Sequence, residues 1–367
     1  MNLTFNEEER MYQQTFREFM DNECSQEVVE EIDKGEKGYS PVIWEKMAGL
    51  GWLGLGLADE QDHDMVVICI LCEEMGKVLL PVPYIPTVVL GGGSVLAGAK
   101  EILRTQVLES IENGSCVISS ALMERDRYEG FDTGECEAAI DNGGYLLNGR
   151  KTYVKGAHVA DYVLLTAGTG GGVTAFLVDP HTSGITLEPL RAMGGERFFN
   201  LSLRDVQIAP EFMLGEAGEG PTLLQPVIHR ARAALAARMV GGASAVLDKS
   251  VEYARERVQF GKPIGSFQAI AFKLADMATE VSGARLLVYK AAWLIDEGEA
   301  GTAKEAAMAK AFASELYQTV ADVGVHIHGG YGFMMEHDLQ LYYRKAKADE
   351  LSFGDADYNR ALVYGAG

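Results

Sequence analysis

The spacing of apolar residues changes twice along this 367-residue chain, and each change predicts a new structural region. In the first region apolar side chains recur every three or four residues, as between Tyr12 and Met20, which is typical of amphipathic helices. From Cys116 short β-rich runs alternate with turn signals, of which Asp141-Asn142-Gly143-Gly144 and Asn148-Gly149 favour tight hairpins. After Gly220 the helical spacing returns and continues to the end of the chain.

These changes predict an α+β multidomain fold with three domains. We expect an N-terminal α-helical domain over residues 1–115, a middle β domain over 116–220 and a C-terminal four-helix bundle over 221–367. A chain of this length with 47% hydrophobic residues can bury a large core. The long helices predicted near the end are joined by short loops, which favours an antiparallel bundle.

Charge and cysteine content narrow the classes of partner and compartment. The formal net charge of -21 argues against nucleic acid or an anionic membrane surface as a partner, because no basic face is apparent. The first residues show no signal peptide, and no uncharged apolar stretch is long enough to span a bilayer. Five scattered cysteines fit a reducing cytoplasm, and Cys69 and Cys72 flank apolar residues, which favours packed thiols over a redox or metal pair. We expect a cytoplasmic protein without a metal site.

Two glycine-containing motifs in the C-terminal region point to a bound ligand. Residues 326–333 read His-Ile-His-Gly-Gly-Tyr-Gly-Phe, and residues 257–261 read Arg-Val-Gln-Phe-Gly. The pair Gly329-Gly330 can end a helix and allows the backbone to approach a ligand without a Cβ in the way. The motifs resemble the Gln-x-x-Gly-Gly-x-Gly-Phe and Arg-x-x-Phe-Gly sequences of the acyl-CoA dehydrogenase family, which both contact FAD. The resemblance extends over nearly the whole chain.

This resemblance implies an FAD-dependent oxidoreductase that acts on acyl-CoA substrates. Family members use a carboxylate to take a proton from the carbon next to the thioester, while a hydride leaves the following carbon for the flavin. They generally pass their electrons to an electron-transfer flavoprotein. The family chemistry therefore requires a base, contacts to the flavin ring and contacts to the adenosine half of FAD.

The residues at both usual positions of the base carry no carboxylate. The commoner form of the family uses the Glu of a Tyr-Glu-Gly-Thr motif, and the corresponding residue here is Phe353. The less common form carries a Glu just before an Arg on the first bundle helix, and here Ala231 precedes Arg232. Asp355 is the remaining candidate for the base. Its alternative role is that of a solvated or helix-capping residue.

The positions that correspond to flavin-ring contacts also differ from the family. A Thr-Glu-Pro-x-x-Gly-Ser-Asp type motif usually ends the first β strand, but residues 119–126 contain neither the Pro nor the Gly-Ser pair. The family's Trp-x-Thr becomes Tyr153-Val154-Lys155. Tyrosine can still stack on a ring, whereas a lysine in place of threonine changes both size and charge.

The contacts to the adenosine half, which a neighbouring subunit supplies in family dimers, are better kept. Arg257 suits a pyrophosphate because its guanidinium offers paired donors that stay charged, although it can also be a surface Arg paired to Glu256 or Asp276. His326 replaces the family Gln and can keep one hydrogen bond. The predicted cofactor-binding residues are Arg257, Phe260, Gly261, Gln268, His326 and Gly330.

The chain thus keeps the FAD contacts that a subunit gives to its neighbour. It differs from the family in the residues that a subunit uses for its own flavin ring and substrate. This asymmetry resembles the non-catalytic chain of two-chain acyl-CoA dehydrogenases, a group that includes bacterial enzymes shortening CoA-linked steroid side chains. The predicted function is a subunit of a heterotetramer that lends FAD contacts to a paralogous catalytic chain. Two alternatives stay open: a self-sufficient homomer with Asp355 as the base, and a flavin-free binding or scaffold protein.

Overall fold

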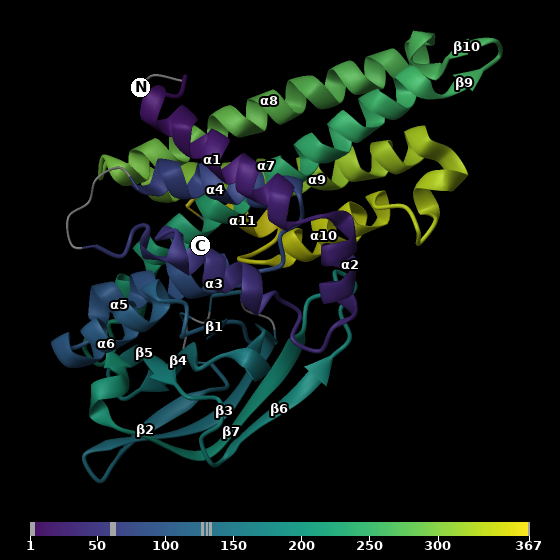
Figure 1. Ribbon diagram of the computed structural model, residues 1–367. Coiled ribbons are helices and arrows are strands. Elements are labelled where there is room, and N and C mark those ends of the chain that lie inside the picture. Colours follow the sequence, from purple (N-terminus) through teal and green to yellow (C-terminus); the bar gives the residue numbers. More distant parts are fainter. Residues whose placement is uncertain (1–3, 59–63, 126–127, 130, 132–133, 366–367) are drawn as a thin grey trace. The chain divides into compact units, whose positions relative to one another are not determined.

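A computed structural model describes residues 4–58, 64–125, 128–129, 131 and 134–365 (Figure 1). The chain forms two compact units. The first, here called the helical unit, comprises Met1–Glu31, His63–Leu80 and Arg232–Gly367. The second, called the sheet unit, comprises Ile32–Asp62 and Pro81–Ala231. The predicted order of a helical, a β and a second helical region is confirmed.

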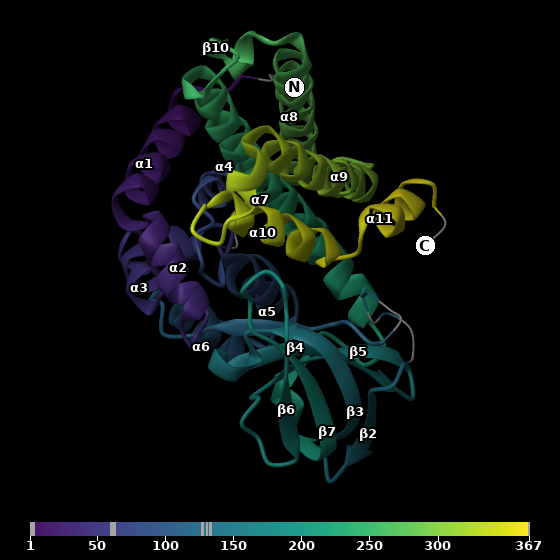
Figure 2. The same cartoon turned by 90° about the vertical axis from the view of Figure 1, so that its right-hand side faces the viewer.

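The helical unit contains long helices from both ends of the chain, and α7 enters it from the sheet unit (Figures 1 and 2). The glycine-rich face of α7 lies against α4. A Cβ added to Gly76 would lie 1.9 Å from the carbonyl oxygen of Arg238, and one added to Gly241 would lie 1.9 Å from that of Glu73. Glycine therefore allows the two backbones to touch. The helices are α1 (Glu7–Glu23), α2 (Gln26–Lys34), which crosses into the sheet unit, α4 (Asp64–Lys77), α7 (Gly220–Glu256), α8 (Gln268–Asp296), α9 (Thr302–His328), α10 (Leu339–Leu351) and α11 (Ala356–Val363).

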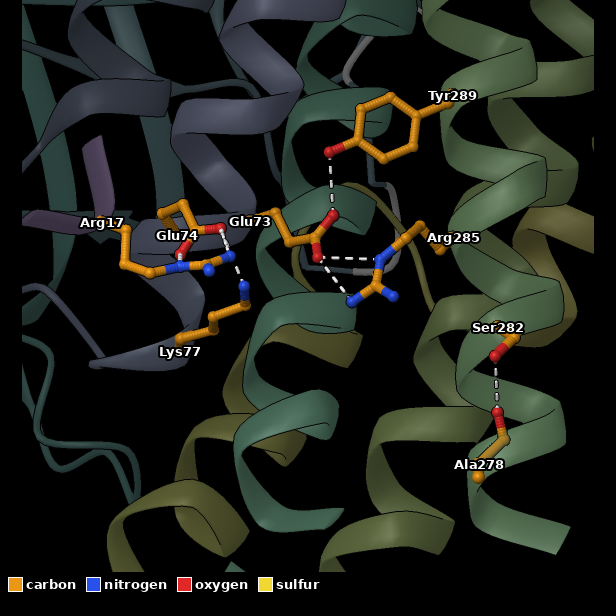
Figure 3. A network of polar contacts seen from close by, with 8 residues as sticks. All are labelled: Arg17, Glu73, Glu74, Lys77, Ala278, Ser282, Arg285 and Tyr289. Atoms are coloured by element: carbon orange, nitrogen blue, oxygen red, sulfur yellow. Dashed lines mark hydrogen bonds and ion pairs between the residues drawn. The ribbon is translucent and has the colours of Figure 1, made fainter. Parts of the chain in front are cut away.

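Two buried carboxylates on α4 join three helices of this unit (Figure 3). Glu73 accepts hydrogen bonds from the Arg285 guanidinium at 2.9 Å and the Tyr289 hydroxyl at 2.8 Å. Glu74 pairs with Arg17 at 3.1 Å and with Lys77 at 2.8 Å. Each buried charge therefore has an oppositely charged partner, which a buried ion needs to offset the loss of water. The network serves the packing of α1, α4 and α8.

The sheet unit is built around one mostly antiparallel sheet in the order β6-β7-β3-β2-β4-β5-β8, with β1 pairing in parallel to β4. Its core consists of alternating inward side chains such as Leu147, Val163, Phe176 and Leu201. The strands are β1 (Ile118–Ala121), β2 (Glu137–Asp141), β3 (Gly144–Lys155), β4 (Tyr162–Thr169), β5 (Gly172–Val178), β6 (Ile185–Leu190), β7 (Phe198–Ile208) and β8 (Met213–Leu214). The helices are α3 (Pro41–Gly49), a π-helix η2 (Ile85–Gly92), α5 (Gly93–Gly98) and α6 (Glu101–Glu112).

One predicted hairpin is confirmed and the other is wrong. Asp141 pairs with Gly144 across a two-residue turn with positive φ at Asn142 and Gly143, as a tight primed turn requires. Asn148-Gly149 lies inside β3, where the register to β7 shifts. A Cβ on Gly149 would lie 2.2 Å from the carbonyl oxygen of Glu135. The glycine is thus needed for a close backbone approach rather than for a turn.

Candidate functional site

The motif at residues 257–261 forms a short hairpin between α7 and α8. The Arg257 amide donates to the Tyr253 carbonyl at 2.8 Å, and the Arg257 carbonyl accepts from the Ile264 amide at 2.8 Å. Strands β9 (Val258–Gln259) and β10 (Lys262–Pro263) pair around Phe260 and Gly261, whose φ angles are both positive. We call residues 257–264 the Phe260 hairpin. Arg257 lies at its base with an exposed side chain.

Phe260 is an unusual residue for the tip of a hairpin. Its side chain is 94% exposed, and a positive φ costs a residue with a Cβ about 1–2 kcal/mol. Its ring meets the Phe267 ring edge to face at a centroid distance of 6.2 Å. Gln268, the first residue of α8, is also exposed. The hairpin therefore combines local backbone strain with an exposed aromatic side chain.

The motif at residues 326–333 ends α9 and forms the 3-10 turn η6 (Gly329–Phe333), called here the Gly-Gly turn. His326 is exposed, and its carbonyl accepts the Gly329 amide. Gly329 has a φ of 63°, which favours glycine. No atom lies within 4 Å of a Cβ added to Gly330, so the backbone there is open to a ligand. Figure 1 shows this turn and the Phe260 hairpin at the same end of the helical unit.

Phe353 lies in a loop whose backbone carbonyls accept hydrogen bonds from buried side chains. Residues 350–355, called the Phe353 loop, comprise the end of α10 and its connection to α11, and Phe353 and Gly354 both have positive φ. The Lys310 ammonium donates to the carbonyls of Glu350 at 2.9 Å and Gly354 at 3.0 Å. The Asn359 side-chain amide donates to the carbonyls of Phe353 at 3.2 Å and Gly354 at 2.9 Å. The loop is therefore fixed although Phe353 offers no proton acceptor.

Lys310 was not identified from the sequence. It is fully buried on α9 and donates a third hydrogen bond to the Ser314 hydroxyl at 2.8 Å. Burial lowers its pKa to about 7, against the opposing effect of the nearby carboxylates of Asp349 and Glu350. The available signal was a lone lysine within the apolar, alanine-rich run of residues 306–313.

The two other candidate positions for a base are occupied as follows. Asp355 is the N-cap of α11, and its carboxylate accepts the Tyr358 amide at 2.8 Å. This is the capping role that the sequence left open for it. Ala231 is completely buried on α7, and its methyl group cannot accept a proton.

The residues predicted near a flavin ring lie in the sheet unit. Tyr153 is 55% exposed, with a φ of 55°, where the register of β3 shifts between Lys151 and Val154. Lys155 forms an ion pair with Glu196 at 3.0 Å, and its carbonyl accepts the Ser119 hydroxyl at 2.5 Å. Lys155 is thus held by a carboxylate instead of offering the hydroxyl of a threonine. Asp126 lies outside the described residues.

A buried ion pair beneath this region was also missed. Lys151 and Glu124 are 2.6 Å apart, and both side chains are almost completely buried. Lys151 also donates to the Thr166 hydroxyl at 3.1 Å, and Glu124 accepts the Glu135 amide at 2.8 Å. Glu124 thereby ties the end of β1 to the segment before β2. Among the described residues, no cluster of His, Cys, Asp or Glu is suited to hold a metal ion.

Comparison with known families agrees with this three-part architecture. Residues 6–115, 121–206 and 218–366 match the N-terminal, middle and C-terminal domains of acyl-CoA dehydrogenase, respectively. The chain belongs to the acyl-CoA dehydrogenase family. Members of this family bind FAD, so the protein is an acyl-CoA dehydrogenase-like flavoprotein of the oxidoreductase class. No helix in the described part of the chain is long and apolar enough to cross a membrane.

Several relatives match this chain over nearly their whole length. The caffeyl-CoA reductase-Etf complex subunit CarC of Acetobacterium woodii is 34% identical, with 99% of each chain covered. The structure of butyryl-CoA dehydrogenase from Megasphaera elsdenii has a TM-score of 0.87 at 28% identity, covering 100% of this chain and 99% of the other. A chain of the ChsE4-ChsE5 complex from Mycobacterium tuberculosis has a TM-score of 0.90 at 28% identity, covering 100% and 98%.

Proposed function

We propose that this chain is a subunit of an FAD-dependent acyl-CoA dehydrogenase that works with a paralogous catalytic chain, as a heterotetramer of two of each. In this complex it lends contacts to the adenosine half of the FAD held by its partner. The observation that carries the proposal is Phe353 at the usual position of the base, in a loop whose backbone is still anchored by Lys310. The loop is intact, but its side chain cannot remove a proton.

The helical unit supplies a surface that fits the adenosine half of FAD. Arg257 offers a charged, exposed guanidinium for a pyrophosphate, and Phe260 offers an exposed aromatic face. The open backbone at Gly330 and the neighbouring His326 can approach the same ligand. In this assignment Gly261 gives the hairpin its turn, and Gln268 adds a polar contact at the start of α8.

The residues of this chain at the family's flavin-ring positions fit the cofactor less well. Bound FAD supplies the hydride acceptor in this family, and a threonine hydroxyl usually meets the ring near the reacting atom. Here Lys155 stands at the threonine's position in the sequence, and it forms an ion pair with Glu196. The partner chain must then supply the base and the ring contacts, and the acyl-CoA thioester would bind on the partner's side.

Names of relatives support the proposed partners. The ChsE4-ChsE5 complex and the steroid acyl-CoA dehydrogenase Tcur3481-Tcur3483 each carry the names of two chains. The name of CarC places that relative in a complex with Etf. For this chain we propose an electron-transfer flavoprotein as the electron acceptor. We propose a bulky acyl-CoA, such as a steroid side-chain thioester, as the substrate class.

A cytoplasmic location is proposed from the cysteines. All five are buried, and burial raises the pKa values of Cys24, Cys72 and Cys116 to about 12, so their thiols stay protonated. Cys69 and Cys72 are fully buried, as expected of packed core residues.

Anaerobic reduction by an acyl-CoA tests the proposal. The chain alone, supplied with FAD and a panel of acyl-CoA thioesters, should not bleach flavin absorbance, whereas its complex with the paralogue encoded beside it should. Bleaching by the chain alone would favour the self-sufficient homomer, and loss of that activity in Asp355→Asn would then identify the base. A complex that contains no flavin would favour the scaffold alternative.

A further inference from the structure

His328 occupies a site between two helices that the proposed function does not use. It is the last residue of α9 and is 5% exposed. Its ring stacks on Tyr253 of α7 at a centroid distance of 4.2 Å and an interplanar angle of 22°. Its Nδ1 lies 2.9 Å from the Gly324 carbonyl oxygen, so this nitrogen carries the proton and donates when the ring is neutral.

The stacked pair joins the two segments assigned to FAD. Tyr253 lies one helical turn before Arg257, and its carbonyl accepts the Arg257 amide that begins the Phe260 hairpin. His328 directly precedes Gly329, the first residue of the Gly-Gly turn. These segments are separated by about seventy residues of sequence, yet one aromatic contact connects their bases.

A second layer of side chains closes the cluster. The His337 ring meets that of His328 edge to face at 5.2 Å, and the Tyr331 ring meets that of His337 at 4.6 Å. Asp338 pairs with His337 at 3.2 Å and with Lys249 of α7 at 2.5 Å. The segment after the Gly-Gly turn therefore folds back onto the same helix that leads into the hairpin.

We propose that Tyr253 and His328 are positioning residues that hold the Phe260 hairpin and the Gly-Gly turn as one surface, and that protonation of His328 weakens this coupling in acid. The inference deepens the proposed function, on which it rests for the identity of the surface as a lent FAD contact. The coupling itself is a property of the helical unit alone.

The charges around His328 set the direction of the pH effect. Burial is the largest influence and lowers its pKa below the ordinary 6.5. His337 and Lys249 lower the pKa further, whereas the Gly324 carbonyl and Asp338 oppose them. His328 is thus neutral at pH 7, and it gains a buried charge only in acid.

Hydrogen exchange on the full-length purified chain tests the coupling. His328→Ala should speed amide exchange in residues 257–263, and Tyr253→Ala should speed exchange in residues 329–334. The expected factor is about two to ten, corresponding to the loss of one aromatic pair. Val320→Ala, a buried truncation on α9 outside the cluster, is the matched control and should leave the hairpin unchanged. The coupling is refuted if each variant disturbs only the segment next to it.

The pH profile separates this role from a general effect on folding. His328→Phe keeps an aromatic ring on Tyr253 but cannot titrate. After correction for intrinsic rates, hairpin exchange in the natural chain should rise as the pH falls below 6.5 and through the lowered pKa of His328, and it should stay level in His328→Phe. Equal profiles for both proteins would overturn the pH claim. These measurements need neither FAD nor the partner, so a failed flavin test in the complex would leave their result standing.

Discussion

The Phe260 hairpin and the Phe353 loop both place a Phe-Gly pair at positive φ in the helical unit, but they use it in opposite ways. Phe260 is 94% exposed at the tip of two short strands. Phe353 is partly buried, and buried donors from Lys310 and Asn359 hold its backbone. In the proposed function, the first segment meets the FAD of the partner chain. The other, in the same proposal, keeps the backbone anchoring of an active-site loop without the carboxylate base that the chemistry needs.

This difference teaches that the changes in this chain are confined to particular side chains. A general loss of structure around the base and flavin-ring positions would have left the nearby buried polar groups without partners. An unpaired buried charge is costly. Instead Lys151 and Glu124 remain paired in the sheet unit, and Lys310 has three acceptors in the helical unit.

The largest expected effect comes from breaking the buried pair in the sheet unit. Glu124→Ala leaves the Lys151 ammonium buried without its carboxylate and should destabilise the protein by about 3–5 kcal/mol. Denaturant unfolding measures this loss. The double variant Glu124→Leu with Lys151→Met is the control and should recover most of the stability. Near-natural stability of Glu124→Ala would mean that the buried pair does not stabilise the sheet unit, and it would contradict the claim that the changes are confined to particular side chains.

A smaller effect is expected on the lending surface. Arg257→Ala removes a charge-assisted contact, which is worth about 1.5–3 kcal/mol, and should weaken FAD retention by the mixed complex about 10- to 100-fold. Fluorescence of released flavin during dialysis measures this. Arg255→Ala, an exposed arginine in the last turn of α7, is the matched control. If both variants retain FAD equally, Arg257 is only a surface arginine.

The stability of the chain should fall in acid for a specific reason. Burial lowers the pKa values of His229 and His328 below 6.5, so the unfolded chain binds more protons than the folded chain once the pH drops below that value. Their contribution is complete above pH 6.5 and decreases as the pH falls toward the folded pKa, by ~1.4 kcal/mol for each unit of difference. Thermal unfolding against pH measures this, and His328→Phe should show a shallower slope. An unchanged slope would exclude His328 as a source.

The smallest effect is expected from Phe353→Glu, which changes one side chain in the Phe353 loop. Phe353→Glu restores a carboxylate in the Phe353 loop, but Lys155 and Glu196 still replace the usual ring contact. We expect no acyl-CoA dehydrogenation by this variant of the chain alone, measured with an artificial electron acceptor. Activity would show that the site formed by this chain's own residues lacks only its base. The difference between the two Phe-Gly segments would then rest on the single side chain of Phe353.

The sequence predicts this fold well because its main signals are local. The change from helical to strand spacing, the Asn142-Gly143 turn and the glycine that ends α9 each depend on neighbours within a few residues. The Asn148-Gly149 prediction failed because the same dipeptide suits a turn or a bulge, and the strand that crosses it decides.

The candidate site is less predictable because its supports are distant in sequence. Lys310 binds carbonyls forty and forty-four residues away. Tyr253 meets His328 across the whole of α8 and α9. No local pattern reports such contacts, whereas the motif at Arg257 and the cap at Asp355 follow from adjacent residues.

Flavin stoichiometry tests the central claim most directly. The chain would be co-expressed with the acyl-CoA dehydrogenase paralogue encoded beside it, and FAD would be counted against each polypeptide in the purified product. The account predicts a stable mixed complex with FAD on half of its chains and no FAD on this chain alone. A homomer of this chain with FAD on every subunit would contradict it.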